Sequence, residues 1–194
     1  MSNPFSWSSD GKTLALAEIS PDLRYADIGT LSMEGDHPVK TLLHEEYIQH
    51  QPVISPDGKY MAYMSTESGK MEVYVRPFPE VNKGKWPIST DGGESPLWSR
   101  DGRELFYRNG GAIMAVAVDT KSTFSAGKPK MLFQGTYLTG YEDSPAWDMS
   151  PDGKLFLMMK PPASTAAAPT PAVPRKINIV LNWLEELKQR VPVE

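Results

Sequence analysis

The chain has 194 residues, a formal net charge of −4 and no cysteine, and 40% of its residues are hydrophobic. The lack of cysteine excludes disulfides, thiolate metal sites and cysteine nucleophiles. The lysines and arginines are scattered and form no basic stripe, so we expect no nucleic-acid partner. No apolar run approaches the length of a membrane-spanning helix, so we expect no membrane span.

One phrase recurs along the chain at intervals of about 50 residues. It consists of a serine, one further residue, Asp-Gly and a basic residue, and it stands at 8–12, 55–59, 99–103 and 150–154. Asp-Gly between two apolar runs is a strong hairpin signal, because glycine tolerates the left-handed backbone of a tight turn. A repeat of this length predicts four-stranded β-propeller blades.

The phrase pairs the expected strands, taken in chain order. Strands are predicted before it at 4–7, 52–54, 96–98 and 147–149, and after it at 13–19, 60–64, 104–107 and 155–159. Two more strands complete each of the first three repeats, at 25–33 and 39–43, 71–78 and 86–89, and 112–118 and 130–133, with a further hairpin turn at Asn109-Gly110-Gly111. We expect Trp7, Trp98 and Trp147, which recur on the first strands, to pack between blades.

The fourth repeat ends differently from the others. A Pro/Ala-rich stretch at 161–175 predicts an extended loop, and a strand is expected at 177–181. A short C-terminal helix at 182–191 is then predicted, because Asn182 and Glu185 form a capping box. The sequence therefore predicts an all-β fold, a propeller of antiparallel four-stranded blades. About four blades per chain are expected, at 3–46, 47–91, 92–136 and 137–183.

The recurrent Ser-Pro-Asp-Gly-Lys phrase and the stretch 95–102 resemble TolB-type, WD-like β-propeller repeats. Residues 147–157 and 177–187 are similar to the end of propeller domains attached to bacterial serine/threonine kinases. The resemblance implies a ring of sheets that binds proteins, peptides or small ligands at its axis or top face. The Gly-x-Ser-x-Gly elbow of the hydrolases that some relatives carry is absent from the sequence, as is the kinase motif set.

The chain is short for this family, since closed propellers have about four to eight blades. A partial ring would expose the sheet faces at its two ends. Three solutions are open: a fragment of a longer protein, a small four-bladed ring, or two chains joined end to end. We favour the homodimer, with the strand at 177–181 at the joint. The first residues carry no signal peptide, which predicts a cytoplasmic protein, or an extracytoplasmic one if the chain is part of a membrane-linked regulator.

Polar residues precede the proline-containing first strands and predict a ligand site at the mouth of the channel. These candidates are His50, Gln51, Glu94, Ser95, Glu142 and Asp143. Tyr137 and Tyr141 lie in a long connection between blades and are further candidates for the ligand entrance. His50, Glu94 and Asp143 are candidates for holding a divalent cation. His37, His44 and His50 are close in sequence, but their spacing fits no standard metal motif.

Three functions remain open at this point. The first is a ligand- or protein-binding module without intrinsic catalysis. The second is a metal-dependent hydrolase, esterase- or lactonase-like, in which a cation at the axis activates water. The third is a structural fragment of a larger regulator. The missing nucleophile motif and the lack of tight metal-ligand spacing place the binding module first.

Overall fold

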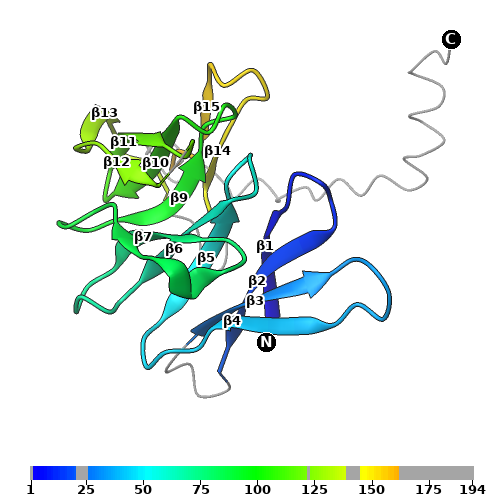
Figure 1. Cartoon of the computed structure of the whole chain (residues 1–194). Helices are drawn as coiled ribbons and strands as arrows, with labels where there is room; N and C mark the ends of the chain where they lie inside the picture. The colour runs from blue at the N-terminus through cyan, green and yellow to red at the C-terminus, as the bar shows by residue number, and fades with distance from the viewer. Residues whose placement is uncertain (1, 21–25, 122, 139–144, 162–194) are drawn as a thin grey trace, which may run out of the picture. The chain divides into compact units, whose positions relative to one another are not determined.

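The computed structural model describes residues 2–20, 26–121, 123–138 and 145–161, all within one compact unit, Met1–Pro161. Consecutive strands pair with one another to form antiparallel sheets, coloured from blue to yellow along the chain in Figure 1. The first sheet has the order β1-β2-β3-β4, with β1 (Ser2–Trp7), β2 (Thr13–Ile19), β3 (Ala26–Ser32) and β4 (Val39–Leu43).

The second and third sheets repeat this plan. The second consists of β5 (Gln49–Ile54), β6 (Tyr60–Ser65), β7 (Glu72–Pro77) and β8 (Trp86–Pro87), with a short 3-10 helix η1 (Val81–Lys83) before β8. The third consists of β9 (Glu94–Trp98), β10 (Glu104–Asn109) and β11 (Ala112–Asp119), and β11 pairs with both β12 (Ser125–Ala126) and β13 (Lys130–Gln134). A hairpin of β14 (Trp147–Met149) and β15 (Phe156–Met158) begins the fourth repeat.

The four Asp-Gly turns share one hydrogen-bond network. In the first turn, the Ser8 hydroxyl donates to Asp10 Oδ1 at 2.6 Å, and the Lys12 and Thr13 backbone N–H groups donate to Asp10 Oδ1 and Ser8 Oγ. The same three bonds recur in the turns at 55–60, 99–104 and 150–155. The glycines have φ angles of 70°, 71°, 69° and 72°. The predicted turns therefore occupy matching places in successive sheets.

The core lies between consecutive sheets. One cluster joins the second and third sheets through Tyr60, Ala62, Val73, Trp98 and Leu105, among others. A second cluster joins the first and second sheets, and a third joins the third sheet to the β14–β15 hairpin. The first strands of neighbouring sheets also contact one another. The Trp98 indole N–H donates to the Val53 carbonyl at 3.1 Å, and the Ile54 N–H donates to the Ser6 hydroxyl at 3.0 Å.

This arrangement confirms the predicted fold class of antiparallel four-stranded propeller blades. The Pro/Ala-rich stretch beyond Pro161, the strand at 177–181 and the helix at 182–191 lie outside the described residues. Trp98 and Trp147 are each 5% exposed and pack between sheets as expected, but Trp7 is 54% exposed. The exposure of Trp7 corrects the expectation that all three tryptophans are core residues. Among the described residues, no helix is long and apolar enough to cross a membrane.

Candidate functional site

The candidate mouth residues of the second and third sheets lie at the start of β5 and β9. His50 is 6% exposed, and its ring meets the Phe5 ring of β1 edge to face, with ring centroids 4.9 Å apart. Gln51 and Ser95 are also buried, whereas Glu94 keeps 36% of its side chain exposed. These positions are mostly packed between sheets rather than open to water, because the first strands lie against one another.

Gln51 and Ser95 share an unusual backbone conformation. Each precedes a proline and has a left-handed φ, 51° at Gln51 and 52° at Ser95, in the interrupted register of its first strand. Such a conformation is strained for a residue other than glycine. The Oε1 atom of Gln51 is buried and has no hydrogen-bond partner among the described residues. The start of β5 therefore holds a strained backbone and an unpaired acceptor at one point.

Glu94 faces a buried arginine. Its partner in the β9–β10 register is Arg108, whose side chain is 1% exposed and whose Nε lies 4.0 Å from Glu94 Oε1. Arg108 Nη1 also donates to the Leu138 carbonyl at 2.6 Å, which ties β10 to the connection after β13. Burial raises the pKa of the Glu94 carboxyl, and the charge of Arg108 opposes this shift.

The other candidates are placed only in part. Tyr137 follows β13, where its ring meets Phe133 edge to face and lies 5.7 Å from Lys160 Nζ. Tyr141, Glu142 and Asp143 lie outside the described residues. Within the described part of the chain, no group of three or more His, Cys, Asp or Glu side chains is placed to hold a metal ion.

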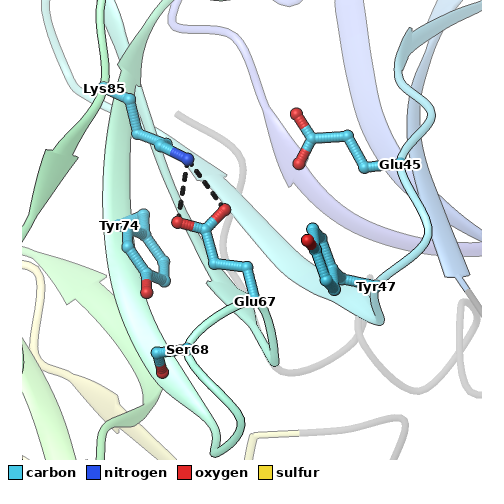
Figure 2. Close-up of a pocket in the computed structure, with 6 residues that line it drawn as sticks. All are labelled: Glu45, Tyr47, Glu67, Ser68, Tyr74 and Lys85. Carbon is cyan, nitrogen blue, oxygen red and sulfur yellow. Dashed lines mark hydrogen bonds and ion pairs between the residues drawn. The ribbon is translucent and has the colours of Figure 1, made fainter.

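A cavity of about 390 Å³ lies near the start of β5. It is lined by Glu45, Tyr47, Glu67, Ser68, Tyr74 and Lys85. Glu45 and Tyr47 belong to the connection between β4 and β5, whereas Glu67 and Ser68 belong to the turn between β6 and β7. These two segments meet because the Thr66 N–H donates to the Ile48 carbonyl at 3.1 Å. Figure 2 shows Glu45 and Tyr47 on one wall and Tyr74 and Lys85 on the other.

The Glu45 wall is held from behind by a buried guanidinium. Arg76 Nη2 donates to Glu45 Oε1 at 2.7 Å, and Gln49 Nε2 donates to Glu45 Oε2, also at 2.7 Å. Arg76 Nε donates to the Tyr63 hydroxyl at 2.8 Å, and burial raises the pKa of that phenol. Both carboxylate oxygens of Glu45 therefore have protein donors, which fixes the carboxylate in one orientation.

The opposite wall carries a second ion pair. Lys85 Nζ donates to both oxygens of Glu67, at 2.8 and 2.9 Å, as the dashed lines in Figure 2 mark. The same ammonium lies 5.7 Å from the centroid of the Tyr74 ring, a cation–π distance. Burial is the main cause that raises the pKa of the Tyr74 phenol, so this group is a neutral donor at pH 7. The cavity thus presents paired charges, phenols and one serine hydroxyl.

No sequence motif indicates this cavity. Its residues come from three connections and the strand β7, and their spacing follows no local motif. The available signal was topological: in a four-stranded antiparallel blade, the second turn and the connection into the first strand lie at the same end of the sheet. The predicted site residues His50 and Gln51 lie at that same end of the sheet, because they directly follow Gln49 at the start of β5.

Solved structures with a similar arrangement include TolB from Agrobacterium tumefaciens, with a TM-score of 0.60 and 23% identity over 82% of this chain and 57% of that chain. TolB from Acinetobacter baumannii has a TM-score of 0.59 and 19% identity over 84% of this chain and 38% of that chain. The periplasmic gluconolactonase PpgL from Pseudomonas aeruginosa has a TM-score of 0.50 and 20% identity, over 79% and 48%.

The chain therefore covers 38% to 57% of the length of these three proteins. Neither the protein-family models nor the curated proteins gave a match. At these identities the similarity concerns the fold and not the activity. The strand order, the repeated turns and these neighbours together show that the chain has a TolB-like β-propeller fold.

Proposed function

We propose that this chain is a binding module without catalysis of its own, and that the cavity between Glu45 and Lys85 takes a small, neutral, polar ligand. The observation that carries the proposal is the internal pairing of the charges that line the cavity. Glu45 is paired with Arg76 and Glu67 with Lys85, so little net charge is left for an ionic ligand.

The size and the walls of the cavity favour the same class of ligand. A volume of about 390 Å³ falls within the range of about 300–1,000 Å³ that small-molecule sites occupy. Carboxylate and hydroxyl oxygens accept hydrogen bonds, the phenols and the ammonium donate them, and the ring of Tyr47, which is 43% exposed, offers an apolar face. A sugar or a short uncharged peptide combines hydroxyl or amide groups with such apolar faces.

The test is a ligand screen on the full chain by thermal shift, followed by calorimetry on the compounds that stabilise it. A panel of neutral saccharides and uncharged tripeptides is expected to contain a ligand that raises Tm with concentration, because binding to the folded state adds to its stability. Tyr47→Ala is expected to abolish this shift without lowering the Tm of the free protein. Met131→Ala, which truncates a 59% exposed side chain on β13, is the matched control.

A metal-dependent hydrolase is the second candidate, because Glu94 is a partly exposed carboxyl with a raised pKa and the solved structures of similar fold include a gluconolactonase. Arg108 stands against it, since a guanidinium 4.0 Å from Glu94 disfavours a cation there. Metal analysis of the purified chain and chelator-sensitive turnover of a lactone decide between the two. Bound metal together with turnover that Glu94→Gln abolishes would replace the binding module with the hydrolase.

The third candidate function places the chain within a larger regulator. The similarity of residues 147–157 to propellers attached to bacterial kinases supports a ligand-sensing part of a larger regulator, and the third candidate, a structural fragment of such a regulator, shares that context. A fragment without a ligand of its own would show no response to any compound in the screen.

A further inference from the structure

The residue directly before the turn serine occupies the same position in every repeat. These residues are Trp7, Ile54, Trp98 and Met149, and each pairs with the second strand of its sheet in the same register. Ile54, Trp98 and Met149 are 7%, 5% and 4% exposed, whereas Trp7 is 54% exposed. In the third and fourth repeats, this residue is buried against the preceding sheet. Trp7 is thus a core residue by position but lacks the sheet that would cover it.

The β14–β15 hairpin, at the other end of the described sheets, also has an apolar face that no sheet covers. In each repeat, the residue eight positions after the one that precedes the turn serine lies on the second strand. These residues are Ala15, Ala62, Phe106 and Leu157, and the first three are 0%, 0% and 5% exposed. Ala62 and Phe106 are buried against the sheet that follows them. Leu157 is 70% exposed, and its neighbour Leu155 is 69% exposed. The other face of β15 packs against the third sheet through Phe156 and Met158. β15 is therefore apolar on both faces, as an internal strand is.

The contact between the second and third sheets shows how two such faces fit together. Trp98 packs in one cluster with Tyr60 and Ala62, and its indole N–H donates to the Val53 carbonyl. By repeat position, Trp7 corresponds to Trp98, Leu157 to Ala62, and Asp148 to Val53. The exposed Trp7 face and the exposed Leu157 face are thus the two halves of an interblade contact.

We propose that a second copy of this chain supplies the missing half at each end. Trp7 of one copy packs on the exposed face of β15 of the other copy, and its indole N–H donates to the Asp148 carbonyl there. One observation favours a second copy as the occupant: both halves of the contact occur on one chain, Trp7 on β1 and Leu157 on β15. Two copies related by a twofold axis form the contact twice and close the ring.

The first test measures the mass of the full chain in solution by light scattering. We expect twice the chain mass of 21.5 kDa at micromolar concentration. Trp7→Ala and Leu157→Asp each change a side chain that is more than half exposed in the single chain, and each is expected to reduce the mass to that of one chain. Met131→Asp, at a 59% exposed position on β13 of the third sheet, which lies at neither joint, is the matched control and is expected to leave the dimer unchanged. Far-ultraviolet circular dichroism checks that each variant retains its sheets.

A mixture of the two variants tests the pairing itself. When Trp7→Ala and Leu157→Asp chains are combined in equal amounts, one of the two joints has both native halves. The mixture is therefore expected to associate more strongly than either variant alone. A monomeric wild-type chain would overturn the proposal. A dimer that neither substitution weakens would overturn it as well.

Discussion

The indole N–H of Trp98 donates to the backbone carbonyl of Val53, 3.1 Å away, across the boundary between the second and third sheets. The side chain is 5% exposed and lies in the cluster that joins these sheets. Side-chain packing is the main contact between neighbouring sheets, and a directional bond at the boundary also fixes how far one sheet can slide on the next.

Trp98→Phe is expected to lower the free energy of unfolding by about 2 kcal/mol, because the Val53 carbonyl loses its donor and part of the ring volume is left empty. The measurement is urea denaturation followed by circular dichroism. Trp7→Phe is the control at the same repeat position. At concentrations where the chain is monomeric it is expected to change the value by less than about 0.5 kcal/mol. Equal losses for the two variants would contradict this account.

Glu45→Ala tests the ion pair behind the cavity. The substitution leaves the Arg76 guanidinium, whose side chain is 8% exposed, without its carboxylate, and a loss of about 2 kcal/mol in unfolding free energy is expected. Glu80→Ala removes an ion pair with Lys83 in which both side chains are more than 60% exposed, and it is expected to have almost no effect. The free energy of unfolding of both variants is measured by chemical denaturation. An unchanged value for Glu45→Ala would contradict the structural role of the Glu45–Arg76 pair.

Ser55→Ala removes both side-chain hydrogen bonds that Ser55 makes in the second turn. Ser55 donates to Asp57 Oδ1 at 2.6 Å and accepts from the Tyr60 N–H at 3.0 Å, and it is 2% exposed. We expect the free energy of unfolding to fall by about 1–2 kcal/mol, because the buried backbone N–H of Tyr60 loses its hydrogen-bond acceptor. Ser8→Ala makes the same change in the more exposed first turn and should lower the melting temperature less. The reverse order of the two melting temperatures would refute this ranking.

Acid should destabilise the fold through the same turns. Hydrogen bonds from the serine hydroxyl and from a backbone N–H hold the pKa of Asp10, Asp101 and Asp152 below the ordinary value of 3.8. A carboxyl with a lowered pKa in the folded state contributes stability above its unfolded pKa and loses it as the pH falls through the folded pKa. Glu94, with a raised pKa, acts in the opposite sense but is a single group.

Urea midpoints measured from pH 7 down to pH 3 are therefore expected to stay level and then fall below about pH 4. In Asp101→Asn the fall should be shallower, because one of the titrating groups is gone. A stability that rises as the pH drops below 4 would contradict the lowered pKa values.

The strands were predictable from the sequence because their limits are set locally. Asp-Gly turns and Asn109-Gly110-Gly111 mark the strand ends, and β2, β4 and β14 have the predicted bounds. The short elements β12 and η1 were missed, since two or three residues carry no periodic signal. Trp147 was assigned to the repeat position of Trp98, but Met149 occupies it, because Trp147 pairs with Met158 and Met149 pairs with Phe156.

The candidate site was harder to predict than the fold. The sequence placed His50, Gln51, Glu94 and Ser95 just before the first strands, whereas β5 and β9 include them. It also could not show that the packing of those strands buries three of the four. The cavity depends on the approach of Tyr47 to Tyr74, which belong to segments that only the blade topology brings together. Such a site has no sequence spacing of its own, so it emerges only from the coordinates.

Every strand in the described sheets pairs with a strand close to it in the chain, and each of the four Asp-Gly hairpins carries its own closed turn. The backbone hydrogen bonds of one sheet therefore do not depend on the next sheet. The total stability is approximately the sum of the stability of each sheet and of the contacts between neighbouring sheets. Hydrogen exchange should then reveal sheets that open one at a time, with the outermost ones opening first. In the monomeric chain, the second and third sheets, which both have neighbours on either side, are expected to exchange most slowly.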